Sequence, residues 1–123
     1  MNKISTIAAR KFKLGEPWKQ DNTIVQLRSD GGVEMLLFNN LIATYTPALR
    51  PELVLEFGGY PTRTSKDRLN AILYEFSFGG KIKQINNNNY LVNTRKNSRT
   101  KLFISDCIRF RYKSNILLFD SKD

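Results

Sequence analysis

Positively charged side chains gather in two places near the C-terminal end of the chain. The first is a polar run whose cations are Arg95, Lys96, Arg99 and Lys101. Arg and Lys neutralise phosphate, and the Asn, Ser and Thr residues between them supply the shorter contacts that fix register on a nucleic acid. The second is the run 108–113, whose cations are Arg109, Arg111 and Lys113. Both patterns indicate binding of an anionic partner.

In the second run the cations alternate with apolar residues, which predicts a strand with two different faces. If the apolar face packs in the core, the cations form an outward row spaced ~6.5–7 Å apart, comparable to the spacing of phosphates. If the aromatic residues are exposed instead, they can stack on bases. Burial is favoured because aromatic residues of strands usually pack in cores. The non-functional interpretation of both runs is that solvated Lys and Arg side chains protect an edge strand from aggregation.

The excess positive charge is distributed unevenly along the chain. The whole protein carries 20 Lys and Arg against 11 Asp and Glu, a net charge of +9. Residues 81–123 hold ten basic and three acidic side chains, whereas residues 1–80 hold ten and eight. This asymmetry predicts a nucleic acid or an acidic protein surface as the partner.

The composition is poor in catalytic groups. There is no histidine, the commonest general base and metal ligand, so we expect neither a metal nor a cofactor site. The single cysteine, Cys107, fits a reducing compartment and lacks the neighbours that would activate a thiolate. The glycine pairs match no phosphate-binding loop, and no apolar run is long enough for a membrane span or a secretory signal. We therefore expect a binding protein and not an enzyme.

One amphipathic helix is predicted between Thr64 and Phe76. Its apolar stripe is Leu69, Ile72, Leu73 and Phe76. Thr64 is the predicted N-cap, with Asp67 completing a weak capping box, and Gly79-Gly80 the predicted stop. The opposite face is expected to be solvated and carries Asp67, Asn70, Ala71 and Tyr74.

Strands are predicted on both sides of this helix. Segments 23–28, 33–38 and 41–45 form a meander through an Asp30-Gly31 turn, and residues 53–57 form a fourth strand. After the helix, residues 81–85 and 90–92 form a hairpin, and 102–104 and 108–112 add one or two more strands. Residues 116–119 are a short apolar run that is expected to pack back on the domain. The predicted fold class is α+β, with a strand meander, one central helix and further antiparallel strands.

The predicted organisation is a single α+β domain over residues 23–119, with a polar end at 120–123. Residues 1–22 are expected to form a basic N-terminal arm or a first edge strand, with a transit peptide as the remaining alternative. The segment 16–22 is turn-like around the single Trp18, which serves either as core or as an exposed anchor.

The run from Gly59 to Leu73 contains Lys-x-Arg-Leu-Asn-Ala-Ile-Leu after a Gly-Tyr pair. It resembles a helix motif of small bacteriophage-encoded proteins, and the similarity extends over about residues 23–93. The resemblance implies a phage source and the host-cell cytoplasm, and it supplies no mechanism. Within the motif, Arg68 is expected to snorkel beside the core stripe and Asn70 to bond a neighbouring loop.

The leading functional hypothesis is a small phage-type protein that contacts nucleic acid, or a host nucleoprotein complex, through the seven cations of the C-terminal third. The first alternative is an inhibitor of a host enzyme or defence system that docks through its basic face without nucleic acid. The second alternative is a minor virion or assembly component.

Overall fold

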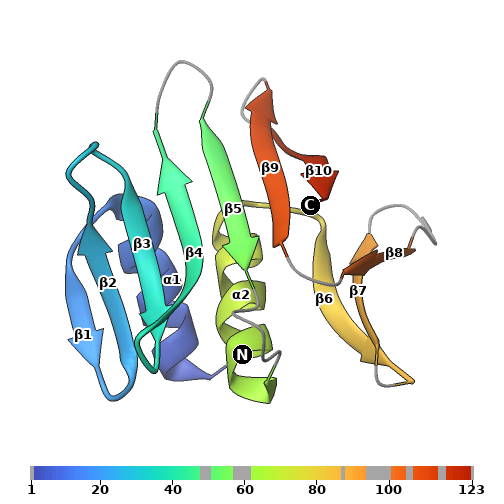
Figure 1. The fold of residues 1–123 in the computed structure, drawn as a ribbon, viewed down its shortest axis with the longest axis horizontal. Coiled ribbons are helices and arrows are strands. Elements are labelled where there is room, and N and C mark those ends of the chain that lie inside the picture. Colours follow the sequence, from blue (N-terminus) through green and yellow to red (C-terminus); the bar gives the residue numbers. More distant parts are fainter. Residues whose placement is uncertain are drawn as a thin grey trace.

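The computed structural model describes the backbone of residues 2–47, 51–56, 62–86, 88–93, 101–104, 107–113 and 116–122, and most side chains as far as Val92. Within these ranges the chain forms two helices and ten strands (Figure 1). The strands pair antiparallel in two separate sheets. The predicted α+β class is confirmed.

The larger sheet has seven strands. In spatial order they are β1 (Trp18–Gln20), β2 (Thr23–Leu27), β3 (Val33–Leu37), β4 (Asn40–Thr46), β5 (Glu52–Glu56), β9 (Cys107–Lys113) and β10 (Ile116–Lys122). The predicted meander of β2, β3 and β4 is confirmed, with Gly31 at φ +87° in its first turn. The turn-like interpretation of segment 16–22 is wrong at β1, because Trp18 pairs with Val25 and packs partly buried against the core.

The smaller sheet consists of β6 (Gly80–Ile85), β7 (Asn88–Asn93) and β8 (Lys101–Ile104) in that order. The predicted hairpin and the strand after it are confirmed. Gly80 was predicted to help end the helix, but it opens β6 instead. A Cβ at Gly80 would lie 2.4 Å from the carbonyl oxygen of Val92, so only glycine allows this close pairing.

Residues 3–14 form the helix α1 (Lys3–Leu14), so the expected arm or edge strand is wrong for this part of segment 1–22, whereas Trp18–Gln20 forms the edge strand β1. Asn2 caps it by accepting a 2.8 Å hydrogen bond from the Ser5 N–H, and Gly15 ends it in the left-handed conformation at φ +70°. Ala8, Ala9 and Phe12 are fully buried on one face. Ser5, Ala8, Ala9 and Phe12 recur at helical spacing, but the alternation of apolar residues with lysines over residues 11–14 suggested a strand.

Helix α2 (Arg63–Glu75) begins two residues earlier than predicted, because Thr62 and not Thr64 is the N-cap. The Thr62 hydroxyl oxygen accepts a 3.0 Å bond from the Ser65 N–H. The helix ends before the glycine pair, with Ser77 in the left-handed region at φ +60°. Its apolar stripe is buried as predicted, but Ala71 is also buried, because α2 packs against α1, β4 and β6 together.

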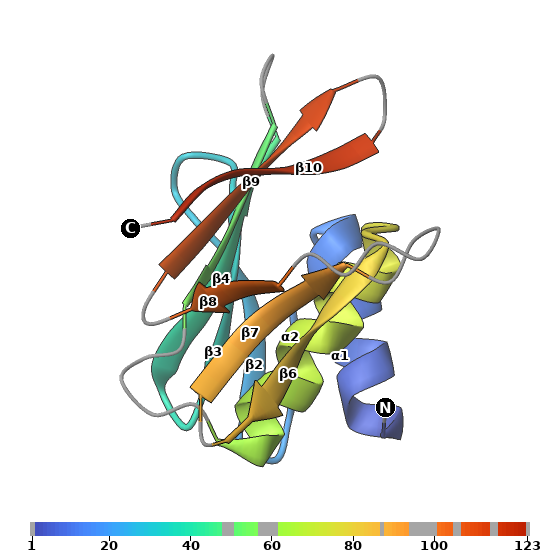
Figure 2. The ribbon, with the colours of Figure 1, turned by 90° about the vertical axis from the view of Figure 1, so that its right-hand side faces the viewer.

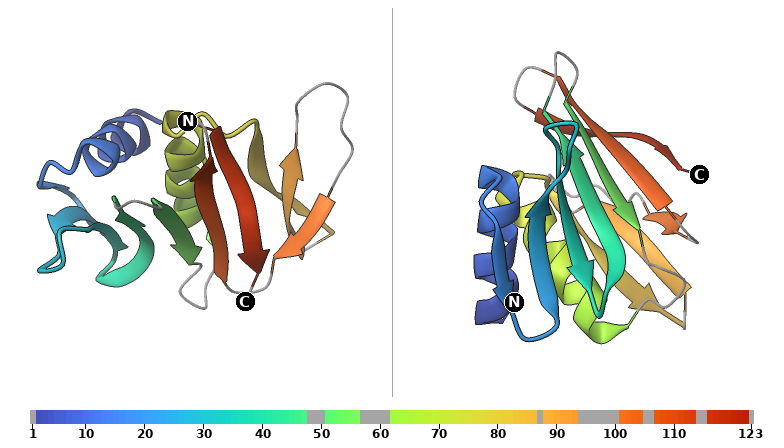
Figure 3. Two further views of the ribbon diagram at one scale, coloured as in Figure 1. Left: turned by 90° about the horizontal axis from the view of Figure 1, so that it is seen from above. Right: turned by 60° about the vertical axis from the view of Figure 1, so that its left-hand side comes forward.

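Both helices lie against one face of the larger sheet (Figures 2 and 3). The hydrophobic core lies between the helices and this sheet. Phe76 from α2 meets Phe12 of α1 at a ring distance of 6.1 Å and Tyr45 of β4 edge-on at 4.9 Å. The smaller sheet packs on the other side of α2 through Ile82 and Leu91. Helix α2 is therefore the element that joins the two sheets.

Candidate anion-binding groove

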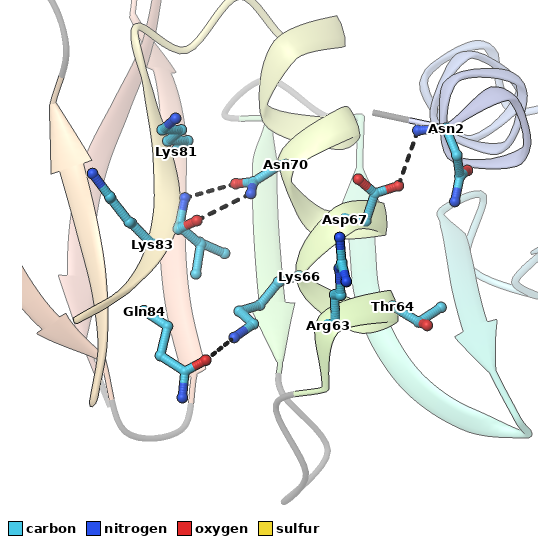
Figure 4. Close-up of a pocket in the computed structure, with 10 residues that line it drawn as sticks. Asn2, Arg63, Thr64, Lys66, Asp67, Asn70, Lys81, Lys83 and Gln84 are labelled. Atoms are coloured by element: carbon cyan, nitrogen blue, oxygen red, sulfur yellow. Dashed lines mark hydrogen bonds between the residues drawn. The ribbon is translucent and has the colours of Figure 1, made fainter. Parts of the chain in front are cut away.

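A groove of about 540 Å³ lies between the first half of α2 and the edge strand β6 (Figure 4). We call it the basic groove, and it is lined by Asn2, Arg63, Thr64, Lys66, Asp67, Asn70, Lys81, Ile82, Lys83 and Gln84. Its lining contains four cations and a single carboxylate. None of the four cations was singled out as a site residue from the sequence.

The two walls of the basic groove are joined by side chains of α2. The Asn70 amide donates a 3.0 Å bond to the Ile82 carbonyl and accepts a 2.6 Å bond from the Ile82 N–H. This amide satisfies the free edge of β6 as a neighbouring strand would. Lys66 Nζ donates to Gln84 Oε1 at 2.8 Å. Asn70 therefore bonds a strand, and the expectation that it bonds a loop is wrong.

The four cations come from both walls. Arg63 and Lys66 lie in the first turns of α2, and Lys81 and Lys83 lie two residues apart on β6, where both are exposed. Among the described side chains, none of these four takes part in an ion pair. Cations are unfavourable at the start of a helix, where the macrodipole is positive, and α2 has no acidic residue in its first turn. Their position does not serve helix stability.

The carboxylate of the basic groove is already engaged by the protein. Asp67 Oδ2 accepts bonds from the Asn2 N–H, at 3.3 Å, and from the Ser5 hydroxyl. It also lies 3.9 Å from Arg68 Nη1. Asp67 therefore connects α2 to the start of α1. Its negative charge pairs with Arg68, and no ion pair joins it to the four described cations of the groove.

Arg68 is only 3% exposed, so the expectation that it snorkels is wrong. Its Nε donates a 3.0 Å bond to Thr23 Oγ1, and its Nη1 donates to Ser5 Oγ. Burial lowers the pKa of Arg68, and the nearby negative charge of Asp67 opposes that shift. The residue joins α1, α2 and β2 in one polar network beneath the groove.

The structure separates the cations predicted from the sequence. Arg95, Lys96 and Arg99 lie outside the described residues. Lys101 is on β8 and pairs with Val92 of β7, which pairs with Lys81 of β6. The register therefore places Lys101 in one cross-strand row with a lysine of the basic groove.

The other three predicted cations belong to β9 in the larger sheet. Arg111 pairs with Glu52 of β5, Arg109 pairs with Val54, and Lys113 pairs with Ile116 of β10. Opposite charges that face each other across antiparallel strands attract, so the position of Arg111 already has a carboxylate neighbour. The register therefore places one carboxylate-bearing position beside the β9 row.

The sequence model of the Kyanoviridae Gp96 protein family matches residues 1–111. The chain belongs to this family. The Gp96 family is a phage family, which confirms the phage source implied by the resemblance. Neither the curated proteins nor the solved structures contain a significant match to the chain.

Two further findings describe this Gp96-family protein. No helix in the described part of the chain is long and apolar enough to cross a membrane. Across the residues that the structure describes, no three Cys, Asp or Glu side chains gather as metal ligands.

Proposed function

We propose that this phage protein binds nucleic acid through the basic groove, without performing chemistry on it. The observation that carries the proposal is the gathering of four cations around one groove whose only carboxylate is engaged elsewhere. Lysine and arginine side chains neutralise phosphates and release the condensed counterions of a nucleic acid. Thr64 and Gln84 add the short polar contacts that position a backbone.

The placement of the four cations is electrostatically unfavourable in the unbound protein, which supports a role in binding an anionic ligand. Arg63 and Lys66 oppose the dipole of α2, and like charges on the facing wall repel them. Local conflicts of this kind are expected at functional sites. Phosphate groups between the walls would remove the repulsion.

Nucleic acid fits the groove better than an acidic protein surface does. Lys81 and Lys83, two residues apart on one strand, are separated by ~6.5–7 Å, a regular spacing suited to a repeating backbone. By register, Lys101 lies across the sheet from Lys81, two strands away. The fixed spacing of two cations on one strand suits a polyanion with a regular repeat.

The test is fluorescence anisotropy of labelled DNA and RNA oligonucleotides across about 50 to 200 mM salt. Four phosphate contacts predict a slope of log K against log salt of about −3 to −3.5. Lys81→Glu combined with Lys83→Glu is expected to lower that slope by about 1.5–2 and to weaken binding roughly 30- to 100-fold at 0.1 M salt.

The matched control reverses the charge of two exposed residues far from the groove, Arg10 on α1 and Lys19 on β1. The variant Arg10→Glu with Lys19→Glu has the same net charge as the groove variant. Equal loss of affinity in both variants would show that net charge alone drives binding, and it would overturn the assignment to the groove. Failure to bind any oligonucleotide at about 50 mM salt would overturn the proposed function itself.

A further inference from the structure

The smaller sheet has one face against α2 and one face turned away from it. Ile82 and Leu91 lie on the first face and are 3% and 6% exposed. Because side chains alternate along a strand, Lys81 and Lys83 lie on the second face, where both are exposed. Figure 2 shows β6 and β7 in front of α2.

The register shows which residues share the outer face. Lys83 pairs with Tyr90, and Tyr90 pairs with Phe103 of β8. The neighbouring row, described above, runs from Lys81 through Val92 to Lys101. Residues directly opposite each other in antiparallel strands belong to the same face. The outer face therefore holds three lysine positions around two adjacent aromatic positions.

We propose that this outer face binds single-stranded nucleic acid, with bases stacked on Tyr90 and phosphates held by Lys81 and Lys83. The inference rests on the proposed function and specifies its ligand. Lys81 and Lys83 belong both to the basic groove and to this face, so one strand of nucleic acid contacts both surfaces without a break.

The aromatic positions distinguish a single strand from a duplex. A phosphate backbone alone needs only cations, and the faces of bases inside a duplex are covered by their neighbours. In a single strand the bases are free to stack on protein side chains, and every base offers a π-face. Opposite positions on paired strands have Cβ atoms about 4.5–5.5 Å apart. By register, Tyr90 lies between Lys83 of β6 and position 103 of β8.

The experiment compares a labelled oligothymidylate with a duplex of the same length, using the full chain. We expect the wild-type protein to bind the single strand more tightly than the duplex. Tyr90→Leu, which keeps an apolar side chain on β7, is expected to weaken single-strand binding by at least about fivefold and to leave duplex binding unchanged. Tyr90→Phe, which keeps the aromatic ring, is expected to retain single-strand affinity.

Tyr74→Leu is the matched control, because Tyr74 is a 69% exposed tyrosine on α2 outside the lining of the groove. It is expected to change neither affinity. Unfolding followed by Trp18 fluorescence shows whether each variant is folded. Duplex binding as tight as single-strand binding, or an unchanged single-strand affinity of folded Tyr90→Leu, would overturn this inference. The proposed function would still stand if Lys81→Glu with Lys83→Glu weakened binding, and it would fall with the inference if no oligonucleotide bound.

Discussion

Replacing Asn70 by alanine tests whether one amide holds the two walls of the basic groove together. The substitution removes the 3.0 Å bond to the Ile82 carbonyl and the 2.6 Å bond from the Ile82 N–H. Each such bond contributes about 0.5–1.5 kcal/mol net, so the free energy of unfolding should fall by about 1–3 kcal/mol. At about 2.1 cal/mol/K of unfolding entropy per residue, a chain of 123 residues should lose roughly 4–12 °C in Tm.

The assay is urea unfolding followed by the fluorescence of Trp18, the single tryptophan, which packs against the core. Amide hydrogen exchange at Ile82 is the local readout, because its N–H loses its acceptor in the variant. Asn70→Asp keeps an acceptor for that N–H but places a carboxylate oxygen against the Ile82 carbonyl, so it should also be less stable than wild type. Tyr74→Ala, one turn further along α2 and 69% exposed, should change the unfolding free energy by less than about 0.5 kcal/mol. An Asn70→Ala protein with wild-type stability and wild-type exchange at Ile82 would refute the reasoning.

Two further predictions concern the buried polar groups. Arg68→Met keeps most of the side-chain volume but removes the donors to Ser5 and Thr23 and the cation near Asp67, so urea unfolding should show a loss of about 2–4 kcal/mol. Arg68→Lys should restore only part of it, because an ammonium group lacks the planar fork that reaches both partners, and a loss below about 0.5 kcal/mol in Arg68→Met would contradict the network. Burial raises the pKa of Tyr45 above 10.0, so the unfolded chain loses its phenolic proton first and the wild-type protein should lose stability as pH rises above 10. Tyr45→Phe should lack this part of the alkaline decline when unfolding is measured between about pH 8 and 11, and parallel curves for the two proteins would disprove the assignment.

Local patterns predicted those elements whose periodicity was strong. The apolar stripe of Leu69, Ile72, Leu73 and Phe76, with its helical period, predicted α2. The Asp30-Gly31 turn between two alternating segments predicted β2 and β3. Helix α1 was not predicted, because the alternation over residues 11–14 favoured a strand, although Ser5, Ala8, Ala9 and Phe12 recur at helical spacing. The capping residues Asn2 and Gly15 also mark its ends.

The candidate site was harder to predict although its walls, α2 and β6, are consecutive in the chain, because tertiary packing decides which sides of these two elements face each other. Clusters of cations in the sequence pointed to the C-terminal third, where charge density is highest. The pairing of β9 with β5 places Arg111 opposite Glu52, which no local pattern reveals. A usable signal for the basic groove did exist in Arg63 and Lys66, since cations in the first turns of a helix are unfavourable.

The sequence by itself determined the α+β class and the net positive charge, because composition and short-range periodicity do not depend on tertiary contacts. Tertiary structure alone decided that Asn70 closes the edge of β6, that Arg68 is buried, and that Lys81 and Lys101 share a row. These contacts join residues 12 or more positions apart, and their geometry follows from strand register and helix packing. The net charge therefore follows from the amino-acid composition, whereas the positions of the charged side chains on the surface depend on the fold.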